Sequence, residues 1–267
     1  MFKAIGAAIF VGLMAFSGPR ANAADTPSPG QSVIASIDLT EPFKTRSPWT
    51  FTATQGAAVA DPVVPGETVP GTITLCLSHD GSTDCDLALG EVLRTGDPDD
   101  VTSGPHYLNV AKIEYPDDAH PLLFMQVSGF PAVNNNRAVM TQALRYDAAQ
   151  DRFVAAYQHL TGHNNNQEVR YVADGPLRGA IISAEPTEDA PFAFWITVNR
   201  LTHDGYRSVL RYRSATRYND GNPLLVIDSE MPNLQARMGL WRPGRALPLP
   251  PESCGRPHLV HKELWCQ

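Results

Sequence analysis

Alternating apolar and polar positions dominate the chain after residue 70 and predict antiparallel strands. In 72–77 every second residue is apolar, which is the period of a strand with one buried face. The segment 122–127 is apolar at nearly every position and therefore predicts a central strand. Segments 139–146 and 152–160 flank the turn 147–151, an arrangement typical of a hairpin.

A second hairpin is predicted further along the chain. Apolar residues alternate through 192–198, and Asp204-Gly205 follows, a pair that favours a type I′ turn because both central positions need positive φ. In the returning strand 206–213, we expect the aromatic and apolar side chains on one face and the arginines on the other. The first face has Tyr206, Leu210 and Tyr212, and the second has Arg207, Arg211 and Arg213.

One short helix is predicted over 230–238, with Ser229 as its N-cap, Pro232 near its start and Gly239 at its end. The 23 prolines and 20 glycines argue against a helical bundle. The predicted fold is all-β, an antiparallel meander that forms a sandwich or a barrel. A propeller is less favoured, because the echo of the Asn triplet at 134–136 in 164–166 gives only two copies of a repeat.

The first 68 residues differ in composition from the rest. A positive start, an apolar run over 4–16 and the Ala21-Asn22-Ala23 sequence predict a signal peptide over 1–23. We expect the proline-rich segment 24–68 to be an extended or partly disordered leader, in which 47–53 adds one edge strand. Residues 69–267 are then a single β-rich domain in the periplasm or outside the cell.

The charge of the chain narrows the choice of partner. The sequence has 21 basic and 28 acidic residues, a net charge of −7 that becomes −9 when Lys3 and Arg20 leave with the signal peptide. A nucleic acid or an anionic membrane surface favours a basic partner, so neither is expected. No segment of the mature chain is long and apolar enough to span a membrane, and an envelope protein or a glycan is the expected partner.

The four cysteines form two pairs that are close in sequence. Export favours disulfides, and we expect Cys76 to bond Cys85 and Cys254 to bond Cys266. Four cysteines allow three connectivities, and a thiol or metal site is the alternative, although no C-x-x-C is present.

The densest polar segment, 161–168, is a candidate ligand-binding loop. It gathers an imidazole, three amides and a carboxylate, groups that a sugar or a metal requires. Asparagines also favour left-handed turns through local backbone hydrogen bonds, so a purely structural role stays open. The candidate ligands are His163, Asn164, Asn165, Asn166 and Glu168.

A second candidate lies between residues 206 and 230. Arg211 and Arg213 share one face of a strand and are spaced to clamp a carboxylate or a sulfate, with Arg217 close behind. Asp228 and Glu230 offer a pair of carboxylates for general acid and base catalysis. Salt bridges between neighbouring strands are the structural alternative.

The sequence supports no cofactor and no metal. The acidic turn 80–86 and the oxygen-rich turn 219–222 offer oxygen ligands to a hard cation such as calcium, and this alternative stays open, although neither matches the twelve-residue calcium loop. No nucleophile elbow, zinc-protease motif, phosphate-binding loop or dinucleotide fingerprint is present.

Three segments, 157–170, 210–223 and the closing Leu264-Trp265-Cys266, resemble a group of exported proteobacterial proteins without an assigned function. The resemblance spans roughly 71–266; it implies an envelope protein and transfers no functional residues. Compartment and β content are also similar to those of periplasmic lysozyme inhibitors, an analogy of fold class. The lack of a catalytic motif, the disulfide-linked β framework and the amide-rich loop 161–168 predict a non-enzymatic periplasmic binding or interaction protein, of which an inhibitor is one form. The alternative is a hydrolase, carbohydrate-active for example, that uses Asp228 or Glu230 with the arginine stripe.

Overall fold

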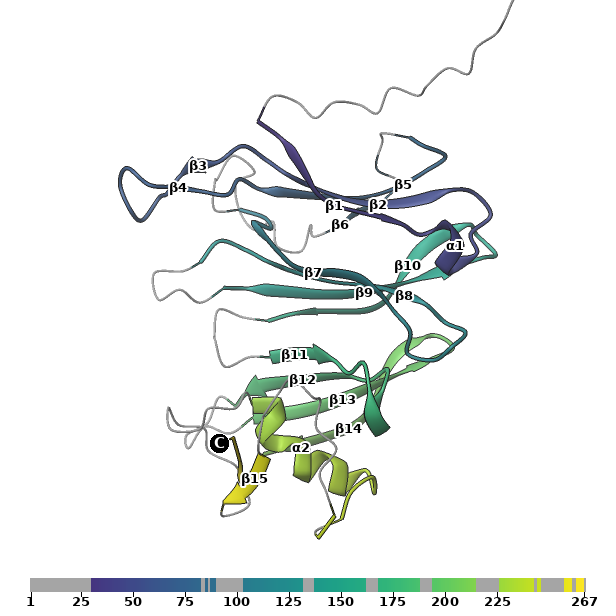
Figure 1. Ribbon diagram of the computed structural model, residues 1–267, viewed down its shortest axis with the longest axis vertical. Coiled ribbons are helices and arrows are strands. Elements are labelled where there is room, and N and C mark those ends of the chain that lie inside the picture. The colour runs from purple at the N-terminus through teal and green to yellow at the C-terminus, as the bar shows by residue number, and fades with distance from the viewer. Residues whose placement is uncertain are drawn as a thin grey trace, which may run out of the picture.

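The computed structural model describes residues 30–82, 85, 87–89, 103–131, 137–161, 168–187, 194–214, 226–242 and 244–245, and the backbone of 257–260 and 263–266. The predicted signal peptide lies outside these residues. Three four-stranded antiparallel sheets account for most of them and stack face to face in Figure 1. The fold is all-β and sandwich-like, as predicted, and the described strands form no closed barrel.

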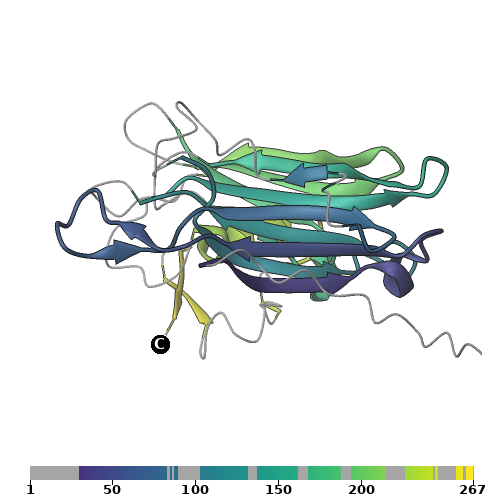
Figure 2. The same ribbon diagram turned by 90° about the horizontal axis from the view of Figure 1, so that it is seen from above.

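Sheet 1 forms the first layer, with the order β1-β2-β5-β6. Its strands are β1 (Ser32–Asp38), β2 (Trp49–Gln55), β5 (Ile73–His79) and β6 (Leu87–Leu89), and a short helix α1 (Thr40–Phe43) joins β1 to β2. The small ribbon of β3 (Val59–Ala60) and β4 (Thr68–Val69) extends from the connection between β2 and β5 (Figure 2).

Sheet 1 includes part of the segment 24–68, which we expected to be an extended or partly disordered leader with one edge strand. Residues 32–55 form two strands, and β2 lies between β1 and β5 rather than at an edge. Prolines 42 and 48 flank these strands, where they remove no ladder hydrogen bond, so the proline content did not prevent pairing. Phe51 and Ala53 point to the core and are fully buried.

Sheet 2 is the middle layer, in the order β10-β9-β8-β7. Its strands are β7 (Tyr107–Glu114), β8 (Leu122–Ser128), β9 (Val139–Asp147) and β10 (Arg152–Leu160). The predicted hairpin of β9 and β10 and the predicted central strand β8 are confirmed. Met125 packs against sheet 1 and Phe124 against sheet 3, which explains why β8 is apolar on both faces.

Sheet 3 is the last layer, in the order β11-β12-β13-β14. It contains β11 (Glu168–Tyr171), β12 (Ile181–Pro186), β13 (Phe194–Thr202) and β14 (Gly205–Arg213), with a short 3₁₀ turn (Gly175–Leu177) before β12. Helix α2 (Val226–Arg237) covers its outer face (Figure 1). The strands β15 (Pro257–Val260) and β16 (Glu263–Cys266) pair with each other next to this helix.

Helix α2 begins at Val226, earlier than predicted, so Ser229 lies inside the helix and is buried instead of capping it. The apolar residues Val226 and Ile227 are buried against sheet 3, and this packing extends the helix toward its N-terminus. Gly239 ends the helix as predicted, with φ +71° and an N–H that donates to Ala236.

The hairpin of β13 and β14 is confirmed, but its turn differs from the prediction. Thr202 pairs with Gly205, so His203 and Asp204 occupy the centre of the turn, and of Asp204 and Gly205 only the glycine has positive φ. A Cβ on Gly205 would lie 2.9 Å from the carbonyl oxygen of Ala156 in β10. Glycine is therefore needed here because sheets 2 and 3 approach closely.

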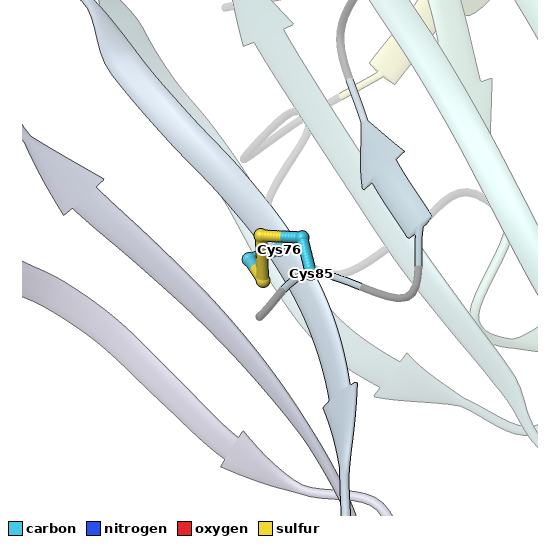
Figure 3. The surroundings of a disulfide bond; sticks show 2 residues. All are labelled: Cys76 and Cys85. Atoms are coloured by element: carbon cyan, nitrogen blue, oxygen red, sulfur yellow. A yellow bond between two sulfur atoms is a disulfide. The ribbon is translucent and has the colours of Figure 1, made fainter. Parts of the chain in front are cut away.

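A disulfide joins Cys76 in β5 to Cys85, before β6 (Figure 3), which confirms the first predicted bond. It closes a loop with a sequence separation of 9. Cys254 lies outside the described residues, so the bond from Cys254 to Cys266 stays a prediction.

Candidate functional site

The structure describes only part of the predicted ligand-binding set. His163, Asn164, Asn165, Asn166 and Arg217 lie outside the described residues, and their roles stay predictions. Glu168, Arg211, Arg213, Asp228 and Glu230 are described, and they lie on two different faces of sheet 3.

Glu168 and Asp228 meet on either side of Arg170, a residue that the sequence analysis did not select. In Arg170, Nη1 donates to Oδ1 of Asp228 at 2.5 Å and Nη2 donates to Oε1 of Glu168. The other oxygen of Glu168 accepts the N–H of Ile227 at 3.2 Å. This cluster fastens the first turn of α2 to β11.

Burial governs the charges in this cluster. It raises the pKa of Glu168 above its ordinary value, although Arg170 acts in the opposite direction. Burial also opposes the charge on Arg170, but Asp228 and Glu168 outweigh it and raise the pKa of Arg170. The three groups are satisfied by one another, which is the pattern of a structural ion cluster.

Glu230 lies two residues after Asp228 in α2 and is fully buried. Its Oε2 accepts the Tyr212 hydroxyl at 3.0 Å and the Asn233 amide at 3.3 Å. Burial, followed by the charge of Glu230, raises the pKa of Tyr212. A general acid or base must reach its substrate, and Asp228 and Glu230 are only 4% and 0% exposed.

The predicted arginine stripe does not face these carboxylates. A bulge at Val209 adds one residue to β14, so Tyr206 packs toward sheet 2 while Tyr212 packs toward α2. Arg207 consequently lies on the opposite face from Arg211 and Arg213. Both of the latter are exposed on the face toward sheet 2, away from α2.

A cleft that the sequence did not indicate lies where one end of all three layers meets. Its volume is about 620 Å³, a size that suits a small ligand. The lining comes from α1, the turn between β7 and β8, the end of β9 and the turn between β13 and β14. The residues are Phe43, Asp117, Ala119, His120, Pro121, Leu122, Arg145, Tyr146, Ala148, Leu201, Thr202 and His203.

Arg145 lines the cleft and has a buried donor that is not satisfied. Its Nε is buried and has no hydrogen-bond partner, and its side chain makes no ion pair within the described part of the chain. An unsatisfied buried donor costs free energy, so an acceptor supplied from outside would find a favourable position here.

Most other polar groups of the cleft are already paired. Asp117 contacts Nδ1 of His120 at 2.9 Å, and this hydrogen bond and backbone N–H groups outweigh burial and lower the pKa of Asp117. Nδ1 of His203 lies 3.0 Å from Asp204 at the rim. The Tyr146 hydroxyl donates to Asp151 at 2.5 Å, and burial together with this bond raises the pKa of Tyr146.

Among the described residues, no three acidic, His or Cys side chains are placed to hold a metal ion. None of the described helices has the length and apolar character needed to cross a bilayer. Comparison with models of known families, with curated proteins and with solved structures found no match.

Proposed function

We propose that the protein is a non-enzymatic binding protein of the bacterial envelope that captures a small anionic ligand in the cleft at the end of the sheet stack. The observation that carries the proposal is the buried Nε of Arg145, which has no hydrogen-bond partner among the described residues and lies in a cleft of about 620 Å³. An inhibitor of an envelope enzyme is one form that such a protein takes, with an acidic side chain of the enzyme as the ligand.

The composition of the cleft supports an anion with an apolar body. Leu122 is buried and Leu201 and Tyr146 half-buried in its wall, which offers apolar surface beside the guanidinium of Arg145. Apolar walls with a few polar groups are the usual composition of small-molecule sites. His120 and His203 are each already engaged by an aspartate, which leaves Arg145 as the anchoring charge.

A panel of small carboxylates, phosphate and sulfate esters tests this proposal. We expect at least one acid with an apolar body to raise the melting temperature and to bind in calorimetry. The substitution Arg145→Gln should weaken binding about 10-fold or more, because a charge-assisted bidentate contact contributes more than a neutral one.

Arg152→Gln is the matched control, since Arg152 is an exposed arginine in the same hairpin and does not line the cleft. Unchanged affinity in the control and lost affinity in Arg145→Gln support the proposal. If no anion binds, or if both variants bind equally well, the assignment of the cleft is wrong.

The hydrolase alternative receives less support from the geometry. Its two carboxylates are buried and hydrogen-bonded, and its arginines lie on the other face of sheet 3. Hydrolysis of a glycan that disappears in Asp228→Asn, in a variant that still folds, would restore this alternative.

A further inference from the structure

A second surface, separate from the cleft, lies on the face of sheet 3 that points toward sheet 2. Its centre is Trp195 in β13, a large aromatic side chain that is still 37% exposed. Around it lie Arg211 and Arg213 of β14, Glu185 of β12 and His159 of β10. We refer to these five residues as the Trp195 face.

Strand register places these residues side by side. Glu185 is directly opposite Trp195, and Trp195 is directly opposite Arg213 on the next strand. Directly opposite residues in an antiparallel pair have Cβ atoms about 5 Å apart. Arg211 reaches over the indole, with its guanidinium carbon 4.8 Å from the ring centroid.

Arg211 and Arg213 are not neutralised by any acid among the residues that the structure describes. No ion pair of Arg211 or Arg213 exists within the described residues, and both side chains are exposed. Two residues along a strand separate their Cα atoms by about 7 Å. Stacking on Trp195 restrains the Arg211 guanidinium while leaving its edge N–H donors available, so less entropy is lost when an anion binds.

The other side of the row offers hydrogen-bond acceptors. Glu185 lies 3.3 Å from Nε2 of His159, and its side chain remains 38% exposed. The carboxylate of Glu185 lies two strands away from Arg211 and Arg213. A site for a simple anion would not include this carboxylate, because its negative charge repels the anion. Donors, an acceptor and an aromatic ring in one row suit a ligand that has hydroxyl groups as well as a negative charge.

We propose that the Trp195 face binds an acidic sugar, a saccharide unit with one carboxylate. The carboxylate pairs with Arg211 and Arg213, ring hydroxyls donate to Glu185, and the apolar C–H face of the sugar contacts Trp195. The net charge of −7 disfavours long polyanions, so the ligand is a glycan with isolated acidic units. This site is independent of the cleft proposal.

Calorimetry with matched disaccharides tests the proposal. The probes are disaccharides that end in glucuronate, galacturonate or mannuronate, each beside the neutral disaccharide that differs only in the carboxylate. We expect one acidic disaccharide to bind at least 10-fold more tightly than its neutral counterpart. Arg211→Gln and Arg213→Gln should each remove that 10-fold preference, and Trp195→Ala should weaken binding of both disaccharides.

Arg207→Gln is the control, because Arg207 is exposed on the same strand but on the opposite face. The Arg207→Gln variant should bind the acidic disaccharide with wild-type affinity. The Arg145→Gln variant should also keep wild-type affinity, and this result distinguishes the Trp195 face from the cleft. Absence of binding to every uronate probe overturns the proposal. Acetate that binds as tightly as the acidic disaccharide would also overturn it. The same holds if the wild-type protein is retained on anionic vesicles and the Arg211→Gln variant is not.

Discussion

The substitution Arg170→Met tests the assignment of Glu168 and Asp228 to a structural cluster. The change removes the cation that both carboxylates share and replaces it with an apolar side chain of similar length. The side chains of Asp228 and Glu168 are 6% and 15% exposed, so water does not readily take the place of the guanidinium. Both acids would then lack their main compensating charge.

The size of the effect follows from this burial. Breaking a buried ion pair by removing one partner costs about 3–5 kcal/mol. Arg170 itself is 22% exposed, which lets water reach part of the cluster. We therefore expect the free energy of unfolding at pH 7 to fall by about 3 kcal/mol, the lower end of that range.

The loss should depend on pH in a known direction. Burial already raises the pKa of Glu168, and Arg170 is the largest factor that lowers it, so the variant should raise it further. A carboxyl whose pKa is raised by folding contributes stability below its unfolded pKa and loses it as the pH rises. The deficit of the variant relative to the wild type should therefore shrink as the pH falls from 7 toward the ordinary glutamate value of 4.5.

Urea denaturation followed by circular dichroism at pH 7 and pH 5 measures both quantities. Arg213→Met is the control and should change stability by less than about 0.5 kcal/mol, because Arg213 is exposed and makes no ion pair within the described residues. The triple variant Glu168→Gln, Arg170→Met, Asp228→Asn should recover most of the loss. A deficit below about 1 kcal/mol at pH 7, or one that does not shrink at pH 5, would refute the reasoning.

Two further predictions concern the framework. Replacing Cys76 and Cys85 together by serine should lower the free energy of unfolding by about 2.5 kcal/mol in urea denaturation, as expected for a short loop. A reductant should remove this difference between the variant and the wild type. Gly205→Ala should cost more than Gly66→Ala in thermal unfolding, since both have positive φ but only Gly205 would bring a Cβ to 2.9 Å from a carbonyl oxygen. Equal losses in the two glycine variants would contradict the proposed close approach of sheets 2 and 3.

The hydrophobic pattern of the sequence predicts the strands that have one or two buried faces. It predicts the exposed strands at the surface of the stack less well. Residues 122–127, 139–146 and 152–160 correspond closely to β8, β9 and β10, because burial imposes a strong pattern there. β1 lies at the edge of an outer sheet and is mostly exposed, so its sequence carries little periodicity. The stacking order also leaves no local signal, because it depends on contacts between distant segments.

In the candidate sites too, the sequence identifies single residues but not the contacts between distant segments. The carboxylates of Glu168 and Asp228 were identified, but their spacing in the sequence does not reveal that Arg170 lies between them. The cleft is formed by turns from three layers, and no single turn has an unusual sequence. The bulge at Val209 shifts the pattern of β14 by one residue, which is why alternation alone misplaced Arg207 relative to Arg211.

The pairing of charges distinguishes groups that stabilise this fold from groups that are free to bind. Beneath α2, Glu168 and Asp228 share the charge of Arg170, and Glu230 is hydrogen-bonded by Tyr212. Arg145, Arg211 and Arg213 make no ion pair among the described residues, although the chain as a whole has an excess of seven acidic residues over basic ones. Most described arginines make no ion pair with another described residue, so the absence of one does not by itself mark a binding site. Arg145 is distinguished by its buried Nε and Arg211 by its contact with the exposed Trp195, and these features support external anions more strongly than the buried acids support catalysis.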